Sequence, residues 1–183
     1  MLSNLFDSYV KDLSETLERF LKNDLLSATQ MILQKSISNS VWVVGNGGSA
    51  AIAQHFATDW TKGLKSLGHG NPRVFALTTN TSLLTAIGND FGFDEIFKSQ
   101  LEVSGRAGDL LVAISSSGMS PNIISVAKTA KLMEMQIIGL TGVSGILEDI
   151  VDLPLKVESK DTQIIEDIHS IFGHLVFKFV EKR

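Results

Sequence analysis

Two pairs of histidine and carboxylate residues are the strongest chemical signal in the sequence. His55 and Asp59 are four residues apart in a segment of helical pattern, so they project from one face about one turn apart. Glu166 and His174 are eight residues apart in the last helical segment and can address one site two turns long. Imidazoles and carboxylates together suit either general acid–base catalysis or a zinc-type metal site.

Each of these residues also has an ordinary structural explanation when it is taken alone. Asp59 is equally compatible with a solvated helix carboxylate, and any single histidine with a core or surface group. His169 lies between Glu166 and His174 in sequence but on the other side of Glu166, so we expect it to line the same cleft or a subunit contact. Spacing alone does not bring the two helical segments together.

Two polar turns follow predicted strands, and both suit an anion. The turn Gly45-Asn46-Gly47-Gly48-Ser49 opens a helix, where glycines allow close approach of the backbone and the amide groups favour negative charge. It matches neither the GxGxxG nor the Walker spacing, so we expect no nucleotide cofactor. Because many α/β proteins need a glycine turn simply to reverse the chain, this turn alone is weak evidence.

The second turn is richer in hydroxyl groups. It runs from Ser115 to Pro121, with Ser120 as the expected N-cap and Pro121 at the first helical position. Four hydroxyls and free amides suit the oxygens of a phosphomonoester without a cationic side chain. They come from Ser115, Ser116, Ser117 and Ser120. An ordinary serine-rich turn is the alternative.

The elements that must position these residues form an α/β pattern. The first forty residues are helical, with apolar residues at three- and four-residue spacing. Buried strands are predicted at 41–44, 74–77, 110–114 and 137–140, with a weaker one at 152–157. Helices are predicted at 49–62, 81–103 with a break near Gly92, 120–133 and 162–182. Strands that are apolar on both faces and alternate with helices indicate a five-stranded parallel sheet with helices on both faces.

The composition excludes several classes of protein. The chain has 183 residues, 44% of them apolar, and a net charge of −4, which describes one globular domain. No cysteine is present, so disulfides and thiolate nucleophiles are excluded. The acidic balance argues against nucleic-acid binding, and no apolar run approaches the roughly 20 residues that span a bilayer. Acidic residues near the N-terminus argue against a signal peptide, so we expect a cytoplasmic protein whose partners are small molecules or other subunits.

Six segments in order along the chain resemble the SIS (sugar isomerase) domain of phosphoheptose isomerases. They are GNGGS at 45–49, AQHFATD at 53–59, LTAIGND at 84–90, SSSGMSPN at 115–122, IIGLTG at 137–142 and EDIHSIFGH at 166–174. The resemblance implies a single SIS domain over 1–183, a flavodoxin-like three-layer sandwich with an N-terminal helical extension at about 1–38. It also implies a homotetramer with active sites between subunits.

The resemblance further implies a reaction and a set of site residues. The reaction is conversion of sedoheptulose 7-phosphate into D-glycero-D-manno-heptose 7-phosphate for lipopolysaccharide or capsule heptose. The substrate-binding positions of the family fall on Asn46, Gly47, Gly48, Ser49, Asn89, Asp90, Ser115, Ser116, Ser117 and Ser120. The zinc-binding and catalytic histidines match His55 and His174.

Three positions depart from the family pattern. Asp59 stands where the family usually has Glu, Glu166 where it has Gln, and Met119 where it has Asn. We interpret the site as a variant, metal-dependent one, with zinc held by His55, Asp59, Glu166 and His174. Asp59 and Glu166 also belong to the expected substrate-binding set.

The hypothesis from sequence is ketose–aldose isomerisation through a cis-enediolate. Asp59 or Glu166 removes the proton next to the carbonyl, and His174 donates or relays a proton to the neighbouring oxygen. The alternative is a non-catalytic SIS protein that binds a sugar phosphate as a sensor or assembly factor. The presence of both histidines and both carboxylates favours the enzyme. An amino-sugar SIS enzyme is less compatible, because the chain has one domain and no nucleophilic cysteine.

Overall fold

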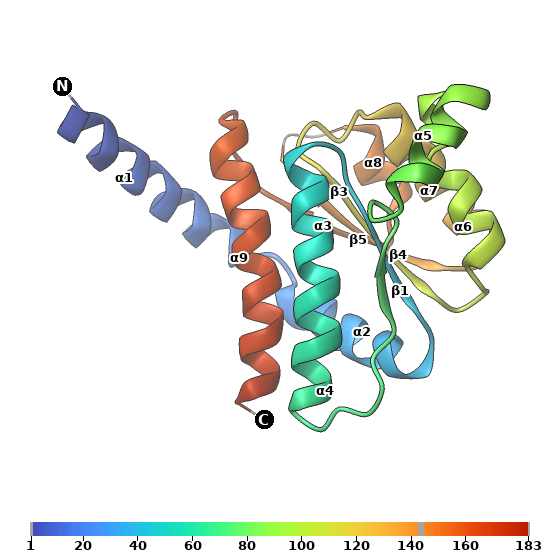
Figure 1. The fold of residues 1–183 in the computed structure, drawn as a ribbon. Helices are drawn as coiled ribbons and strands as arrows, with labels where there is room; N and C mark the ends of the chain where they lie inside the picture. The colour runs from blue at the N-terminus through green and yellow to red at the C-terminus, as the bar shows by residue number, and fades with distance from the viewer. Residues whose placement is uncertain (1, 143–144, 183) are drawn as a thin grey trace.

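A parallel five-stranded sheet forms the centre of the molecule (Figure 1). The computed structural model describes residues 2–142 and 145–182. The strands are β1 (Val41–Val44), β2 (Val74–Ala76), β3 (Leu110–Ser115), β4 (Gln136–Thr141) and β5 (Leu153–Lys156). Their spatial order is β2-β1-β3-β4-β5, and every neighbouring pair is parallel. The predicted fold class is therefore confirmed.

Helices precede the sheet and cover both of its faces. They are α1 (Leu2–Phe20), α2 (Leu25–Ser38), α3 (Gly48–Thr58), α4 (Leu64–Ser66), α5 (Thr81–Asp90), α6 (Lys98–Ser104), α7 (Pro121–Leu132), α8 (Ile146–Ile150) and α9 (Thr162–Glu181). A π-helical turn, Asp59–Gly63, joins α3 to α4, and a 3₁₀ turn, Phe93–Glu95, lies between α5 and α6. No helix of the described residues is long and apolar enough to cross a membrane.

Successive side chains of each strand point to opposite faces of the sheet, and this divides the core into two layers. Val41 and Val43 of β1 belong to the cluster that packs on α2, α3 and α9. Trp42 and Val44 belong to the cluster on the other face, beneath α5, α6, α7 and α8. Because successive side chains of a strand point to opposite faces, an all-apolar strand requires a cover on both sides.

The order of the strands determines where a ligand is expected. The connection from β1 runs to β2 on one side, whereas β3 lies on the other side of β1. In open parallel sheets a ligand binds beyond the carboxyl ends of the strands where this direction reverses. The residues that follow β1 and β3 are the glycine turn and the serine turn, so both predicted anion-binding turns lie at this edge.

The predicted boundaries agree with the structure except in a few places. The predicted helix 81–103 is interrupted around Gly92, as expected, because Gly92 has a φ of +99° that side chains with a Cβ rarely adopt. The predicted helix 49–62 is α3 followed by the π-helical turn. The short helix α8 was not predicted, since its five residues carry too little periodicity.

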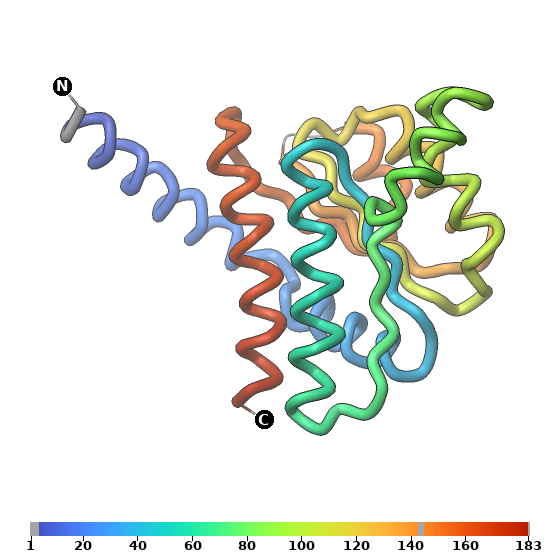
Figure 2. Tube along the Cα trace, in the orientation of Figure 1, coloured from blue at the N-terminus to red at the C-terminus, as the bar shows by residue number. Residues whose placement is uncertain are grey.

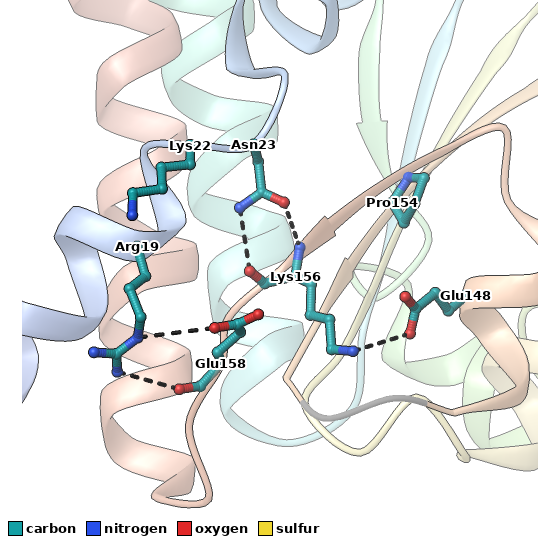
Figure 3. A pocket seen from close by; sticks show the side chains of 7 residues that line it. All are labelled: Arg19, Lys22, Asn23, Glu148, Pro154, Lys156 and Glu158. Carbon is teal, nitrogen blue, oxygen red and sulfur yellow. Dashed lines mark hydrogen bonds and ion pairs between the residues drawn. The ribbon is translucent and has the colours of Figure 1, made fainter.

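The N-terminal helices are attached to the open edge of β5. Asn23, between α1 and α2, donates from Nδ2 to the carbonyl of Lys156 and accepts the Lys156 N–H, both at 3.2 Å (Figure 3). These bonds provide partners for the backbone N–H and carbonyl of Lys156 at the outer edge of β5, where no further strand pairs with it. The N-terminal end of α1 lies away from the sheet (Figure 2), and Leu5, Phe6 and Val10 on it are exposed.

Candidate active site

Helices α3 and α9 lie side by side, and two glycines allow their close approach (Figure 1). A methyl group at Gly173 of α9 would overlap the Phe56 ring of α3, and one at Gly63 would overlap Phe177. The buried Trp60 indole also donates a hydrogen bond to the carbonyl of Gly173 at 3.2 Å. The two helices that carry the histidine and carboxylate pairs are therefore in direct contact.

This contact brings His55, Asp59 and His174 together. His55 Nε2 lies 3.1 Å from Asp59 Oδ2, and His174 Nε2 lies 3.9 Å from the same oxygen. The two imidazole rings meet edge to face with centroids 5.0 Å apart. One ligand atom of each residue lies within 4.8 Å of the others, and all three side chains are partly exposed. The group is open to solvent on one side and can receive a ligand.

The π-helical turn begins at Asp59 and does not change the spacing between His55 and Asp59. The Asp59 N–H still bonds the His55 carbonyl, so the two side chains keep their one-turn spacing. Beyond Asp59 the wider turn leads to Gly63, and a cavity of about 240 Å³ lies there against Phe177. Such π-helical turns occur frequently at functional sites. The cavity is also lined by Lys62 and Ser66 and adjoins the three-residue group through Asp59.

The glycine turn after β1 is open and leaves the start of α3 without a side-chain cap. Gly47 occupies the N-cap position with a φ of +52°, which explains the need for glycine there. Gly47 and Gly48 are exposed, whereas Ser49 is almost wholly buried in the first turn of α3. The Ala50 and Ala51 amides bond carbonyls of the turn, whereas those of Gly48 and Ser49 have no hydrogen bond within the described residues and are available to a ligand.

The serine turn after β3 lies next to the glycine turn. Asn46 and Asn122 exchange two side-chain hydrogen bonds of 2.8 Å, which join the two turns. Ser115 Oγ lies 3.3 Å from Ser120 Oγ. Ser120 is the N-cap of α7, but its hydroxyl makes no capping hydrogen bond and is left for another acceptor or donor.

Asn122 is a residue of this site that sequence reasoning missed. It is 1% exposed, and within the described ranges its side-chain amide forms hydrogen bonds with Asn46 alone. A polar residue at the second position of a helix directly after a serine-rich turn was the available signal.

Ser117 and Gly118 hold the serine turn in shape. Ser117 Oγ accepts the Met119 N–H at 3.2 Å, and Gly118 packs against Gly145 with a φ of +62°. Met119 accepts the Ile146 N–H through its sulfur at 3.4 Å. Ser116 lies at the rim of the same turn and is partly exposed. The hydroxyls of this turn thus have different surroundings rather than one shared orientation.

Glu166 lies beside the glycine turn and outside the three-residue group. Its carboxylate is placed against Gly48, so closely that a methyl group there would overlap both carboxylate oxygens. It makes no hydrogen bond or ion pair with any other residue that the structure describes. Along α9 the eight residues from Glu166 to His174 correspond to about 12 Å. Of the four expected metal ligands, three are adjacent, and Glu166 lies beside the glycine turn.

Asn89 and Asp90 lie apart from these groups, at the C-terminal end of α5. Asn89 Nδ2 donates to Asp90 Oδ1 at 2.9 Å, and both residues are exposed. No hydrogen bond joins them to the two turns or to the His55 group within residues 2–142 and 145–182. Phe91 and Phe93, just beyond them, are also exposed.

His169 was expected to line the cleft or a subunit contact, and that expectation is wrong. Its side chain is fully buried, and Nε2 lies 3.4 Å from the Thr141 carbonyl at the end of β4. Burial lowers the pKa of His169 to about 4, although the Thr141 carbonyl opposes this shift. Its Nδ1 and the Thr141 hydroxyl have no hydrogen-bond partner in the described part of the chain. His169 is therefore a core residue.

Another hollow, of about 480 Å³, lies between the N-terminal helices and β5 (Figure 3). Two ion pairs line it, with Arg19 at 3.9 Å from Glu158 and Lys156 at 3.6 Å from Glu148. Its lining residues belong neither to the two turns nor to the His55 group, so we assign it no part in the site.

The parallel sheet, the glycine and serine turns at its carboxyl edge and the histidine–carboxylate group on the adjoining helices define a doubly wound α/β domain. Residues 6–142 match the family model described as the SIS domain. The chain belongs to this family and, within it, to the phosphoheptose isomerases, which are aldose–ketose isomerases.

Individual relatives support this assignment along the whole chain. The phosphoheptose isomerase of Campylobacter concisus is 43% identical over 185 aligned residues, which cover 100% of this chain and 96% of that protein. The structure of the enzyme from Neisseria gonorrhoeae is 35% identical, with a TM-score of 0.89 and complete coverage of both chains. The structure from Francisella tularensis is 27% identical, with a TM-score of 0.90 and complete coverage of both chains.

Proposed function

We propose that this protein interconverts sedoheptulose 7-phosphate and D-glycero-D-manno-heptose 7-phosphate in the cytoplasm, and supplies heptose for lipopolysaccharide or capsule. The observation that carries the proposal is the His55–Asp59–His174 group between α3 and α9, with the glycine turn at the start of α3 and the serine turn joined to it through Asn46 and Asn122. The full-length similarity to phosphoheptose isomerases supports the choice of substrate.

The distance from the start of α3, which the Asn46–Asn122 hydrogen bonds place next to the serine turn, to the His55–Asp59–His174 group suits a long sugar phosphate. Gly48 and His55 are seven residues apart on α3, which corresponds to about 10 Å along the helix axis. An extended seven-carbon sugar phosphate has a comparable length. With its phosphate on Ser115, Ser116, Ser117 and Ser120, its carbonyl end reaches His55, Asp59 and His174.

The three adjacent side chains fit a divalent metal ion, which we propose is zinc. Two imidazole nitrogens and a carboxylate oxygen form a donor set typical of catalytic zinc, and the open side leaves room for substrate oxygens. Glu166 becomes a fourth ligand only if its side chain turns away from Gly48. When bound, such an ion polarises the sugar carbonyl and stabilises negative charge on it.

Asp59 is suited to be the base, because only one of its oxygens faces the histidines. Oδ2 lies toward both imidazoles, which leaves Oδ1 to take a proton from C1 of the ketose and return it to C2. His174 carries the second proton from the C1 hydroxyl to the C2 oxygen through the enediolate. Glu166 accepts hydrogen bonds from hydroxyls in the middle of the sugar, between the phosphate and the reacting carbons.

We further propose a homotetramer in which Asn89 and Asp90 contact the substrate bound to a neighbouring subunit. The exposed Phe91 and Phe93 beside them support a protein contact there. The exposed apolar residues Leu5, Phe6 and Val10 of α1 support a second contact, since apolar residues clustered on a protruding helix are best covered by another chain.

The direct test is to supply sedoheptulose 7-phosphate and zinc and to follow the aldose product by NMR. We expect turnover that a chelator abolishes and that added zinc restores. Fructose 6-phosphate serves as the matched ketose with one carbon fewer, and we expect it to react more slowly. Binding of sedoheptulose 7-phosphate without any turnover would instead support the non-catalytic sensor.

A further inference from the structure

The glycine turn and the serine turn are joined by a pair of side-chain amides. Asn46 lies in the glycine turn, and Asn122 is the second residue of α7, directly after Ser120 and Pro121. Nδ2 of each side chain donates to Oδ1 of the other, and both hydrogen bonds are 2.8 Å long. Asn46 is half-buried, whereas Asn122 is 1% exposed. One member of the pair is therefore open to a ligand, and the other is enclosed.

Regular structure holds the backbone of both residues. The Asn46 carbonyl accepts the Ala50 N–H at 3.2 Å, in the first turn of α3. Asn122 belongs to α7, where Pro121 restricts the backbone at the first helical position. The Asn46 side-chain amide is the part that would be free to turn in the absence of Asn122, because the terminal torsion of asparagine has broad energy wells.

Asn122 removes this freedom. A primary amide has two N–H donors and an oxygen with two acceptor positions. The reciprocal hydrogen bonds use one donor and one acceptor position on each residue. If the Asn46 amide alone turned over, oxygen would face oxygen and NH₂ would face NH₂, so both hydrogen bonds would be lost beside a buried amide. Asn122 therefore determines the orientation in which Asn46 offers one N–H and one acceptor position to a ligand.

Asn46 offers these two groups where a sugar is expected to lie. It follows β1 at the carboxyl edge of the sheet, beside the reversal of direction between β1 and β3. A sugar hydroxyl both donates and accepts a hydrogen bond, so it matches an amide with one free donor and one free acceptor position. Asn122 is too enclosed to contact a ligand itself.

We propose that Asn122 is a positioning residue that acts through Asn46, whose amide it holds in the orientation that binds a hydroxyl of the sugar. Binding then does not have to order the Asn46 side chain, and the ordering of one side chain on binding lowers affinity roughly three- to tenfold. This inference rests on the proposed function in taking a sugar phosphate as the ligand.

The test is a double-mutant cycle with Asn46→Ala and Asn122→Leu in the full-length zinc-loaded protein, measured by calorimetry as the apparent Kd of sedoheptulose 7-phosphate. Leucine has nearly the size of asparagine and removes both hydrogen bonds. We expect Asn122→Leu to raise Kd roughly three- to tenfold and Asn46→Ala to raise it at least as much. The double variant should bind no more weakly than Asn46→Ala, because Asn122 then has no amide left to position. Asn122→Ala, without a branched side chain, should give the same cycle.

Inorganic phosphate distinguishes the positioning of Asn46 from a change in the serine turn. It binds without a sugar, so we expect its Kd in Asn122→Leu to stay within about twofold of the wild-type value. Thr129→Val, which replaces another buried polar side chain of α7 by an apolar one of similar shape, is the matched control and should leave both Kd values unchanged. In thermal unfolding, the double variant should melt at a higher temperature than Asn46→Ala, in which Asn122 is buried without a partner.

A double variant that binds the sugar phosphate several-fold more weakly than Asn46→Ala would overturn the proposal, because Asn122 would then act independently of Asn46. An equal loss of affinity for inorganic phosphate in Asn122→Leu would also overturn it and would make Asn122 a support of the serine turn. Binding of sedoheptulose 7-phosphate that follows the expected cycle but gives no turnover would overturn the proposed isomerase and support this inference.

Discussion

Two histidines on α9, only five residues apart, have opposite environments. His169 is fully buried against the Thr141 carbonyl, and its pKa is lowered to about 4. The side chain of His174 is 56% exposed and faces His55 and Asp59. The same residue type on one helix is thus a neutral core group in one place and a candidate proton carrier in the other.

The difference arises from what each face of α9 contacts. One face packs on the sheet, where burial disfavours the charged imidazolium. The other faces α3, where a carboxylate and a second imidazole are within ligand distance of one another. A histidine becomes chemically useful here because of its neighbours on a second helix, and variants on the two faces of α9 test that difference.

The largest expected effect is the loss of activity when His174 is replaced. We expect His174→Ala to lower kcat/KM by about 10³-fold, since a group that transfers a proton contributes roughly 10²–10⁴. Stability should change by less than about 0.5 kcal/mol, because the side chain is largely exposed. Steady-state kinetics and thermal unfolding measure the two effects. His69→Ala, at a histidine outside the site, is the matched control and should keep full activity.

A smaller loss of activity is expected when α3 and α9 are pushed apart. Gly173→Ala places a methyl group in the Phe56 ring, and we expect a loss of about 1–3 kcal/mol in unfolding free energy. A displacement of His174 by about 1 Å would also reduce kcat by roughly 10²-fold. Chemical denaturation and kinetics measure both.

The control for this variant is Gly88→Ala in α5, where the added methyl would meet Ile96 at an ordinary 3.5 Å. It should be neutral or slightly stabilising, because alanine favours helix more than glycine does. Equal losses in the two variants would contradict the close helix contact as the cause.

The smallest effect at neutral pH is expected from replacing His169, whose titration changes the stability of the fold at acid pH. Its folded pKa of about 4 lies below the unfolded value near 6.5, so the unfolded chain binds the proton more readily. The stability contribution is therefore complete above about pH 6.5 and is lost as the pH falls toward 4, by about 3 kcal/mol between pH 7 and pH 4. His169→Gln, which does not titrate, should lack this part of the acid destabilisation. An identical pH profile of unfolding in wild type and variant would exclude a buried neutral His169.

The fold was predictable from sequence because local patterns determine it. Four short apolar runs and their polar turns predicted β1 to β4 within about two residues of the observed ends, and Gly92 predicted the break between α5 and α6. Such features depend on periodicity and on residues with special backbone freedom.

The site was predictable only in part, because it depends on contacts between distant segments. Spacing predicted that His55 pairs with Asp59, but not that Gly173 brings α9 close enough for His174 to join them. No local pattern indicated that Glu166 lies against Gly48 or that His169 turns into the core. The roles of these residues in catalysis and metal binding stay predictions.

Zinc-edge anomalous diffraction from crystals of the zinc-loaded protein would show whether His55, Asp59 and His174 together bind one catalytic divalent ion. We expect one anomalous peak per chain, bonded to both Nε2 atoms and to the Asp59 carboxylate, that disappears in Asp59→Asn. A peak bonded to other residues, or no peak in a protein that isomerises the sugar with zinc removed, would contradict this metal site.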